Sequence, residues 1–598
     1  MRASLAAAIA LILLFCTASA QARQTAGGVE RERSPFTDVR FEGERAHVLV
    51  RGQWYEWLEI DGVPYDAILH VARQRFPDRW QKRIAEDLLV LLDAVGQQPG
   101  DTVRLKLRSL EHDTVQLLPA VAMTNENRNR VRDARRQRES DSPIDAAAVF
   151  AEIVKAIRDH HAYADLKSLD LDALALEATH ELGDAPTRSK AILAAQRLIA
   201  RLGDGHARVD GWELHTPRGT LDVLLQHAQG GVVAFRRGPD AKQGNLLDAD
   251  RPYVVSIDGV PIETWIEAAS AYVVDGSPAL VRERSTRTLR YANLIRDRLD
   301  LPHKPTATIR VRSADGTSSK ELELPVGNDF QVYGDWPRTT SRTLDSGFGY
   351  IRLHTMVLDA TALKDLKNTL DSMAETPGLI IDVRGNGGGY RDAINAVAPR
   401  FLDPDQPEAA RVVNVARARL ATADDPANPD GYLGNRHAFP ANWPGWSPIE
   451  RTEIERFNQQ FKPRWQPARG RFSDPHYMVV SREAGGPIYG KPVVVLMDEG
   501  CFSATDIFLG AMKGLPNVTL MGTPSSGGSA NSDGYVIESL GVEIRLATMV
   551  SYATDGRLYD GNGITPDIHV PCIATDLIGQ TDTQLDAAIE HLRAQQSK

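Results

Sequence analysis

Gly378-Leu-Ile-Ile-Asp-Val-Arg-Gly-Asn-Gly-Gly-Gly-Tyr390 is the stretch that decides the fold class of this chain. Its opening residues are mostly apolar, which is typical of a strand buried on both faces of a sheet. Pro492-Val-Val-Val-Leu-Met-Asp498 repeats the pattern, and apolar residues recur at helical spacing between Ala360 and Met373. This alternation predicts an α/β core with a parallel sheet over about 340–575.

Two further segments belong to the predicted core region. Residues from about 402 to 485 are rich in Pro and Trp and include Trp443-Pro-Gly-Trp446. Because so long a connection usually has a function, we expect an insertion that lies over a site or forms a lid. Residues 576–598 predict a C-terminal helix.

The composition is that of a soluble multidomain protein. The chain has 598 residues, 42% hydrophobic and 25% charged, and at roughly 150 residues per domain it predicts about three or four domains. A formal net charge of −10, without a long run of one sign, argues against a nucleic-acid-binding protein. Three cysteines exclude a disulfide scaffold and a cysteine-rich zinc module. The remaining class is a multidomain globular protein, most plausibly an enzyme.

The N-terminus has the features of a secretory signal. Met1-Arg2 is followed by an apolar run to Phe15 and by the small residues Thr17-Ala18-Ser19-Ala20. A basic start, an apolar stretch and an Ala-x-Ala site describe a cleaved signal peptide, and the run is shorter than the ~20 residues that a spanning helix needs. We therefore expect removal of residues 1–20, export to the periplasm or the medium, and no membrane span. Whether Cys501 and Cys572 pair in that compartment stays open.

The first half of the mature chain divides into modules. Alternating strands and an amphipathic helix at about 77–95 predict an N-terminal α/β module over 34–122. Residues 124–142 have almost no apolar side chains and predict a linker or an exposed helix. Apolar residues at helical spacing predict a helical subdomain over 143–205, which ends near Gly203.

Residues 210–328 again favour strands. Their order of strand, Ile257-Asp-Gly-Val-Pro-Ile262 turn, helix and closing strand resembles a PDZ-like peptide-binding module. The related run Ile60-Asp-Gly-Val-Pro64 occurs in the first module, without an evident wider repeat.

The glycine run after the strand at 378–383 is the first candidate site. Glycines there let the backbone turn sharply and direct free N–H groups outward, which suits an anion or oxyanion. A dinucleotide loop needs a third glycine where Tyr390 stands, so that interpretation fails. A plain strand-to-helix turn remains the alternative.

Ser503 is the second candidate, in Asp498-Glu-Gly-Cys-Phe-Ser-Ala-Thr-Asp506. A strand ends near Asp498 and a helix begins at Ser503. The serine, with Asp506 three residues later, fits a helix N-cap and its reciprocal partner. It equally fits a nucleophile at the positive end of a helix dipole. The pattern leaves both interpretations open.

His206 is the third candidate, in Arg201-Leu-Gly-Asp-Gly-His-Ala-Arg208. It follows a helix that ends at glycine, so a simple turn residue is the alternative. His160 and His161 lie on or near a helix and are predicted to be structural. The chain has no His-Glu-x-x-His motif, and the spacing of His206 and His215 is too loose to predict a metal site.

Together these segments resemble the peptidase family of C-terminal processing (tail-specific) proteases, tricorn core proteases and interphotoreceptor retinoid-binding protein. The resemblance runs from about 145 to 572 and leaves out the first module. Its pieces are LGDGHARV at 202–209, IIDVRGNGGGY at 380–390, VVVLMDEGCFSATDIFLGAMKG at 493–514 and YDGNGITPDI at 559–568. It implies a crotonase-like (ClpP/crotonase) α/β core that carries helical and PDZ-like subdomains.

The resemblance implies a role for each matching residue. Ser503 stands at the position of the nucleophile. The processing proteases supply a lysine base downstream, but here that position is Gly528, which excludes the usual Ser–Lys dyad, and Lys513 is too far along the helix to substitute. The tricorn-like branch uses a histidine, which His206 matches, because a neutral imidazole can take the serine proton near pH 7.

The same branch has an acid that matches Asp560, a candidate to orient the histidine directly or through another side chain. Asp567 ends the same segment and is predicted to be structural. The oxyanion donors would be the backbone N–H groups of Gly387 or Gly388 and of Ala504. No metal and no cofactor are implied.

The sequence therefore predicts an exported serine endopeptidase that cleaves polypeptides through an acyl-enzyme, with histidine as the base. One alternative is a non-catalytic protein that binds peptides or apolar ligands on the same scaffold. Another is an ester or amide hydrolase that uses the same residues on non-peptide substrates. No nucleic-acid partner is expected, and the sequence does not determine the oligomeric state.

Overall fold

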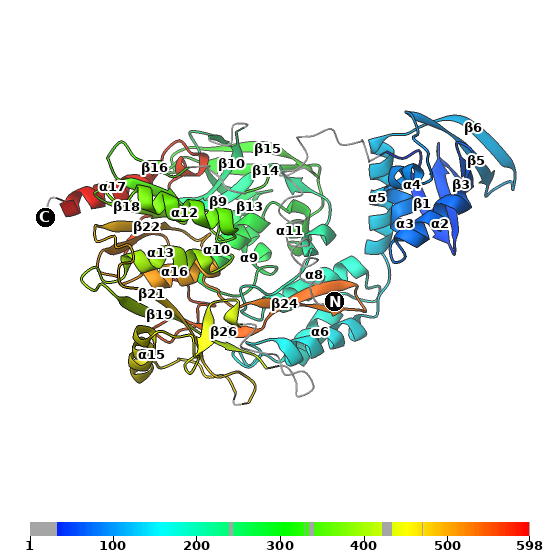
Figure 1. Cartoon of the computed structure of the whole chain (residues 1–598). Coiled ribbons are helices and arrows are strands. Elements are labelled where there is room, and N and C mark those ends of the chain that lie inside the picture. Colours follow the sequence, from blue (N-terminus) through cyan, green and yellow to red (C-terminus); the bar gives the residue numbers. More distant parts are fainter. Residues whose placement is uncertain are drawn as a thin grey trace. The chain divides into compact units, whose positions relative to one another are not determined.

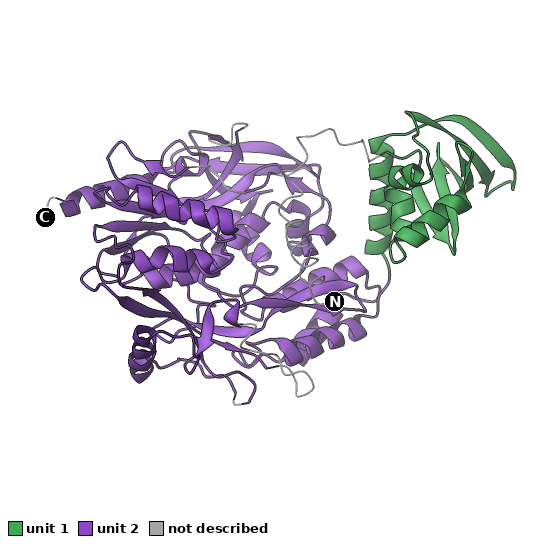
Figure 2. Cartoon of the chain, in the orientation of Figure 1, with its two compact units in different colours: residues 1–142 green, residues 143–598 purple. Residues whose placement is uncertain are grey.

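The computed structural model divides the chain into two compact units, residues 1–142 and 143–598 (Figure 2). It describes residues 33–238, 243–328, 331–333, 340–420, 433–468 and 470–596. The predicted signal peptide at 1–20 lies outside these ranges. Among the residues that are described, no helix combines the length and the apolar character needed to cross a bilayer.

Unit 1 is an antiparallel sheet with helices against it. Its strands run in the order β1-β2-β3-β5-β6, and β4 pairs with β3. The elements are β1 (Asp38–Glu42), β2 (Arg45–Val50), β3 (Gln53–Ile60), β4 (Val63–Pro64), α2 (Tyr65–Arg75), α3 (Trp80–Glu86), α4 (Leu88–Ala94), β5 (Thr102–Ser109), β6 (Val115–Ala122) and α5 (Asn125–Ser140).

One prediction for unit 1 needs correction, because the helix expected over 77–95 is two helices, α3 and α4, with a break at Asp87. Of the two alternatives for residues 124–142, a linker or an exposed helix, the helix is confirmed: they form α5, capped by Thr124, and belong to unit 1. Val131 is the only buried residue of α5, where it joins the core of the unit.

Unit 2 begins with the predicted helical region and continues into a second antiparallel sheet (Figure 1). The helical region contains α6 (Ala146–His160), α7 (Leu171–Glu181) and α8 (Arg188–Ala200), followed by β7 (Arg208–Val209) and the 3-10 helix η1 (Trp212–His215). The sheet region contains β8 (Thr220–Leu221), β9 (Leu224–Ala228), β10 (Gly231–Arg237), β11 (Gly244–Leu246), β12 (Tyr253–Ile257), β13 (Val260–Pro261), α9 (Ile262–Ser270), α10 (Pro278–Thr288), α11 (Ala292–Arg298), β14 (Thr306–Arg312) and β15 (Ser319–Gly327).

This second sheet repeats the topology of unit 1. The strand path β9-β10-β12-β14-β15 matches β1-β2-β3-β5-β6, and a short hairpin strand leads into a helix at the same place in each. The hairpin turns are Asp61-Gly62 and Asp258-Gly259, with positive φ at both residues, as a two-residue hairpin of the favoured type requires. Each aspartate also accepts a backbone N–H, at 2.7 Å and 3.0 Å, from the strand β5 or β14. A wider repeat therefore exists, although the sequence shows only its turn.

The core of unit 2 is the predicted parallel sheet. Its strands run in the order β16-β17-β18-β22-β23-β27, and all pairs are parallel except β16 with β17. The strands are β16 (Arg342–Thr343), β17 (Gly349–Arg352), β18 (Leu379–Asp382), β22 (Val493–Met497), β23 (Val518–Gly522) and β27 (Ile568–His569). Alternate residues pack on helices α12 (Ala360–Ser372), α13 (Asp392–Val397) and α16 (Ala504–Met512) on one face and on α17 (Thr583–Gln596) on the other. Short 3-10 helices are η2 (Ala398–Phe401) and η3 (Asp576–Ile578).

The segment expected as an insertion at 402–485 supplies most of a further sheet. The strand order β20-β21-β19-β26 includes β26 from beyond the segment, so the insertion is built into the core. Its elements are β19 (Ala409–Ala418), β20 (Ala438–Pro440), α15 (Pro448–Gln460), β21 (His476–Arg482) and β26 (Met549–Tyr552). Residues 421–432 lie outside the described ranges, and the described part of the segment does not test whether it acts as a lid.

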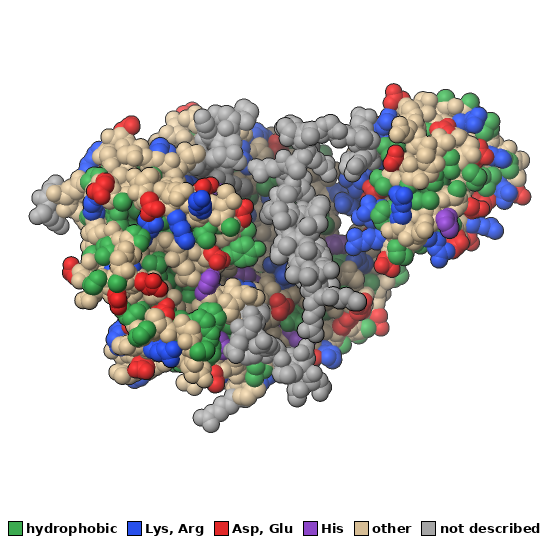
Figure 3. Space-filling view, viewed as in Figure 1, with side chains coloured by type: hydrophobic (Ala, Val, Ile, Leu, Met, Phe, Trp, Pro, Cys, Tyr) green, Lys and Arg blue, Asp and Glu red, His purple; other side chains and the backbone are tan. Residues whose placement is uncertain are grey.

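A small three-stranded sheet links the helical region to the core. Its strands are β24 (Ser532–Ile537), β25 (Val542–Ala547) and β7. On the face of unit 2 seen in Figure 3, acidic and basic side chains are interspersed without a large area of one sign.

Candidate active site

Ser503 lies in the loop between β22 and α16, at the carboxyl end of a central strand. Its backbone has φ 60° and ψ −120°, a conformation that a non-glycine residue adopts only under constraint. Such a strained strand-to-helix turn exposes a nucleophile above a sheet. The N-cap interpretation is wrong, because the Ser503 side chain makes no capping hydrogen bond. Asp506, its expected partner, instead accepts from Ser525 Oγ at 2.5 Å.

His206 Nε2 lies 3.2 Å from Ser503 Oγ, although the two residues are 297 positions apart in the sequence. Pairing of β7 with β25 fixes the segment directly after the histidine. Burial, followed by the nearby guanidinium groups of Arg284, Arg436 and Arg208, lowers the pKa of His206 to about 4 in spite of Asp204. The imidazole is therefore neutral at pH 7, so that Nε2 can accept the serine proton.

Asp560 is buried behind the histidine. Its carboxylate accepts hydrogen bonds from the Gly205 N–H at 3.3 Å, the Ser529 N–H at 3.2 Å and the Tyr163 hydroxyl at 3.0 Å. Burial and the neighbouring charge of Asp204 raise the pKa of Asp560 to about 7. None of these bonds reaches the His206 ring, whose Nδ1 is buried without a hydrogen-bond partner in the part of the chain that is described.

Sequence reasoning missed Asp204, two residues before His206. One carboxylate oxygen accepts the His206 backbone N–H at 2.9 Å and the other accepts the Ala547 N–H at 2.7 Å. Burial alone would raise the pKa of Asp204, but the contact with His161 holds it below its ordinary value. Asp204 is therefore the ionised carboxylate nearest the catalytic pair, and its place in the Gly-Asp-Gly-His206 run was a usable signal.

His161 and His160 were both predicted to be structural. His160 stacks on Tyr535 with ring centroids 4.1 Å apart. His161 is fully buried with Nε2 3.3 Å from Asp204 Oδ2, so it forms the outer end of a chain His206–Asp204–His161. No local pattern could have linked His161 to the site, because the connection is made only by the fold.

The glycine loop after β18 and the serine loop after β22 lie side by side, because adjacent parallel strands end at the same edge of the sheet. The Phe502 N–H donates to Asn386 O at 3.1 Å and the Gly385 N–H to Asp498 Oδ1 at 2.7 Å. A Cβ at Gly388, where φ is +99°, would lie 2.6 Å from Ser503 Cβ. Only glycine therefore allows this approach.

The three predicted oxyanion donors differ in their availability. The Gly388 N–H donates to Asn386 Oδ1 at 2.9 Å and is thereby engaged. Among the residues described, the N–H groups of Gly387 and Ala504 donate to no other atom. Of the two glycines that the sequence offered, Gly387 is thus the one with a free amide.

There is a steric reason why position 528, where the processing proteases have their lysine, holds a glycine. A Cβ at Gly528 would lie 2.4 Å from the Phe502 ring, so the ring occupies the space in which a longer side chain would begin. Lys513 is bound elsewhere, to Thr565 O at 2.6 Å and Asp567 Oδ1 at 3.0 Å. Asp567 also accepts the Leu520 N–H at 2.9 Å, which confirms its structural role.

Three side chains could together bind a metal ion, because one possible ligand atom from each lies within 4.8 Å of the other two. They are those of Asp204, His206 and Asp560. Both carboxylates already accept backbone N–H groups, so a metal would compete with those bonds. His215 instead contacts Ser189 Oγ at 3.1 Å.

Cys501 and Cys572 are both free thiols, which settles the pairing that the sequence left open. Burial raises the pKa of Cys501 well above its ordinary value and that of Cys572 to about 12. Neither thiol is therefore a nucleophile at neutral pH.

Comparison with known proteins agrees with this site. The model of peptidase family S41 matches residues 347–570, which include Ser503, Gly387 and Asp560 but not His206. A carboxy-terminal-processing protease of Bartonella bacilliformis is 36% identical over 80 residues, or 13% of this chain, and the match spans only 18% of that protein.

Two solved structures share the fold. Mature CPAF complexed with lactacystin is 17% identical with a TM-score of 0.51, over 75% of this chain and 97% of that chain. Mature CPAF alone is 16% identical with the same TM-score, over 75% of this chain and 95% of that chain. The core that carries the serine and glycine loops, residues 347–570, is thus the part of the chain that matches peptidase family S41, and the chain is similar over 80 residues to a carboxy-terminal-processing protease.

Proposed function

We propose that the protein is an exported serine endopeptidase in which Ser503 is the nucleophile and His206 the general base. The observation that carries the proposal is the 3.2 Å distance between Ser503 Oγ and a neutral His206 Nε2, at a serine with a strained backbone. These are the two elements of nucleophilic catalysis by serine.

The chemistry follows from the positions of these groups. His206 takes the hydroxyl proton as Ser503 Oγ attacks the scissile carbonyl carbon, and the carbonyl oxygen becomes an oxyanion. The free N–H groups of Gly387 and Ala504 stabilise that charge. The C–N bond then breaks, His206 gives its proton to the leaving amine, and the acyl-enzyme remains. Water, deprotonated by the same histidine, hydrolyses the ester and restores Ser503.

Two carboxylates support the histidine in this scheme. Asp204 holds the His206 backbone and is ionised beside it, which favours the imidazolium formed during attack. Asp560 adds a second negative charge when it loses its proton near pH 7. We assign both as positioning residues, because neither touches the reacting atoms.

The finer architecture is part of the proposal. The parallel sheet with its glycine and serine loops fits a crotonase-like core, and the β8–β15 region fits a PDZ-like module that recognises extended peptides. Export rests on the signal features of residues 1–20 and would leave a mature chain that begins at Gln21.

The test is hydrolysis of an unstructured polypeptide by the mature protein and by Ser503→Ala and His206→Ala, followed by mass spectrometry. Both variants should lose about 10³-fold or more in kcat, and Ser503→Ala should form no acyl-enzyme with a serine-directed probe. His215→Ala is the matched control, because this histidine lies outside the site, and it should keep its activity. Equal rates in wild type and both variants would contradict the mechanism, and turnover of esters without peptides would contradict the substrate class. N-terminal sequencing of secreted protein tests the export.

A further inference from the structure

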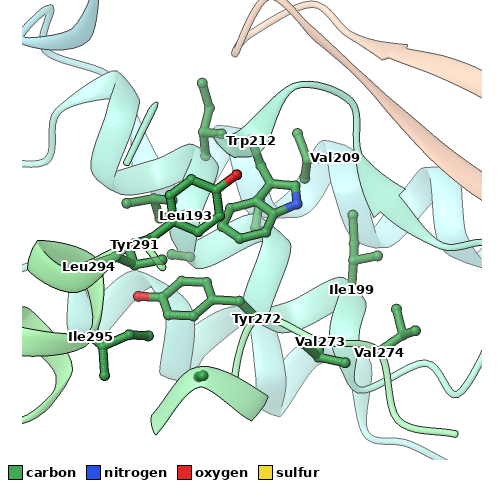
Figure 4. Packing of buried hydrophobic residues seen from close by; sticks show 14 of the residues in the cluster. Leu193, Ile199, Val209, Trp212, Tyr272, Val273, Val274, Tyr291, Leu294 and Ile295 are labelled. Atoms are coloured by element: carbon green, nitrogen blue, oxygen red, sulfur yellow. The ribbon is translucent and has the colours of Figure 1, made fainter. Parts of the chain in front are cut away.

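Two kinds of contact hold the elements around the catalytic pair. On the side of His206, apolar side chains of the helical region and of the β8–β15 region pack in one cluster, and its Trp212, Tyr272 and Tyr291 line a cavity of about 390 Å³ beside the histidine (Figure 4). The glycine loop after β18, in contrast, is held by an ionic contact with the start of the C-terminal helix α17. The proposed mechanism gives this ionic contact no part.

Arg384 is the centre of the ionic contact. Its guanidinium donates to both oxygens of Asp582, at 2.7 Å and 2.9 Å, and to both oxygens of Asp382, at 2.9 Å and 2.7 Å. Each pair of bonds has the forked geometry in which a planar guanidinium holds a carboxylate most firmly. Asp382 ends β18, whereas Asp582 lies 198 residues beyond Arg384 in the chain. The guanidinium therefore joins the edge of the parallel sheet to α17.

The three charged side chains are largely removed from water. Asp382 is 3% exposed, Arg384 18% and Asp582 29%. Against the opposing effect of burial, the positive charges of Arg384 and Arg352 hold the pKa of Asp382 well below its ordinary value, and the negative charges of Asp382 and Asp582 raise the pKa of Arg384. A carboxylate lost from such a group leaves the guanidinium with a poorer set of partners, so the pair should resist displacement.

The same arginine shapes the turn that leads into the oxyanion loop. Arg384 and Gly385 are the central residues of a tight turn, which the Asn386 N–H closes by donating to the carbonyl three residues before it at 3.0 Å. The Arg384 N–H donates to Asp382 Oδ1 at 3.0 Å, and the Arg384 carbonyl accepts from Arg352 Nη1 at 2.8 Å. Backbone and side chain of Arg384 are thus fixed together, so a shift of its guanidinium would turn the loop.

Gly387, whose free N–H is the proposed oxyanion donor, comes directly after this turn. Donors of this kind act only when they are held within about 0.5 Å of the productive position. We propose that Asp582 is a positioning residue, which through Arg384 holds the turn that directs the Gly387 N–H at the oxyanion. The inference rests on the proposed peptidase function and deepens it, with a residue from outside 347–570, the part that matches the peptidase family.

Asp582 also has a purely structural contact, which the test must leave intact. Its Oδ1 accepts the Leu585 N–H at 3.1 Å and so caps α17. Asparagine caps a helix as well as aspartate does, so Asp582→Asn keeps the cap while it removes the charge and one acceptor oxygen. Asp582→Glu retains the charge. Asp586→Asn removes an exposed carboxylate from the first turn of the same helix and is the matched control.

Steady-state hydrolysis of one peptide separates positioning from binding. Asp582→Asn should lower kcat about 10-fold and leave KM within about twofold, because only the developing oxyanion uses the Gly387 N–H. The loss stays below the ~10²–10³-fold of a removed donor because Asp382 still holds Arg384. Asp582→Glu should recover part of kcat, and Asp586→Asn should match the wild type. In an Arg384→Lys background, Asp582→Asn should add little, since it acts through the guanidinium.

A second measurement does not depend on peptide cleavage. Hydrogen–deuterium exchange with mass spectrometry follows residues 383–390, where several amides donate hydrogen bonds. Exchange there should rise in Asp582→Asn, stay unchanged in Asp586→Asn, and remain slow in β22 and β23 of both variants. If the wild type cleaves no peptide but this pattern is found, the proposed function fails and the positioning of the loop stands.

Three results would overturn the inference. The first is unchanged exchange at 383–390 in Asp582→Asn. The second is faster exchange throughout the parallel sheet, which would assign Asp582 to stability alone. The third is a loss of kcat that Asp586→Asn shares, or that persists in full when Arg384 is already lysine.

Discussion

Replacing Asp204 with asparagine is expected to lower the pKa of Asp560 from about 7 toward the ordinary range of an aspartate. The two carboxylates have oxygens within 4.8 Å of each other. At an effective dielectric constant of about 20, two charges at that distance repel by about 3.5 kcal/mol, which corresponds to about 2.5 pKa units. Burial, the larger cause of the raised pKa, remains in the variant and keeps the value above that of an exposed aspartate.

The pH dependence of kcat/KM reports this shift. His206 is neutral above about pH 4, so it does not titrate near pH 7. A rise in kcat/KM near pH 7 in the wild type, the acidic limb of the pH profile, would therefore come from Asp560 as that carboxyl group loses its proton. In Asp204→Asn the limb should move to lower pH by about 2.5 pH units, toward that of His206. In Asp560→Asn the limb near pH 7 should vanish and the plateau should fall. The assay uses one peptide at constant ionic strength.

Two checks separate chemistry from damage to the fold. Asp204 accepts two backbone N–H groups, and an asparagine carbonyl can replace only one of them. The free energy of unfolding should therefore fall by about 1–3 kcal/mol, measured by urea denaturation. Asp533→Asn, an exposed carboxylate on β24, is the control and should change neither quantity. A limb that stays near pH 7 in Asp204→Asn, or that persists in Asp560→Asn, would refute the assignment of that proton to Asp560.

Two further predictions concern the surrounding loops. Gly388→Ala would place a Cβ 2.6 Å from Ser503 Cβ at a φ of +99°, so kcat should fall by about 10²-fold or more while the circular dichroism spectrum is retained. Gly385→Ala, where an added Cβ meets nothing within 4 Å, should cost much less activity, and equal losses in both would argue against the close approach. Burial and the charge of Asp560 raise the pKa of Asp506 to about 8, so the folded protein holds a proton that the unfolded chain loses near pH 4. Stability should therefore fall as pH rises between about 4 and 8, by up to about 1.4 kcal/mol per pH unit from this group, and urea unfolding of Asp506→Asn should show a shallower slope.

The sequence predicted the core well because the physical signals there are local. A continuous apolar strand can be stable only between two covered faces, so β18 and β22 were recognisable one at a time. The loops after them carry glycines that no other residue could replace without a clash, as at Gly388. The Ser503–His206 pair was predictable only from the order of motifs, because its members lie 297 residues apart.

What the sequence did not reveal depends on tertiary contacts. His161 reaches the site through Asp204, and the cavity beside His206 is lined by segments that lie far apart in the sequence. For α5 the sequence left a linker and an exposed helix open, because a single buried Val131 leaves no apolar stripe to decide between them. The segment 402–485 appeared irregular because Pro and Trp separate its strands, whose partners lie as far away as β26.

The topology that unit 1 shares with the β9–β15 region was likewise only partly predictable from the sequence. Only the Asp-Gly turn is shared in sequence, because positive φ at two successive residues restricts the residue type strongly. The strands require only that apolar and polar residues alternate, which many sequences satisfy. If the β8–β15 region is a PDZ-like module, as proposed, unit 1 has the topology of a second one.

The proposed change of base from lysine to histidine involves more than one position, because the Phe502 ring contacts several of the residues concerned. This ring lies 4.6 Å from the His206 ring and beneath the guanidinium of Arg284, and it leaves no room for a Cβ at Gly528 or at Gly205. A lysine at position 528 would therefore displace the aromatic ring that packs against both His206 and Arg284. His206, Gly528 and Arg284 thus belong to one packing arrangement around Phe502, so a related chain that keeps the lysine should lack the histidine and the arginine together.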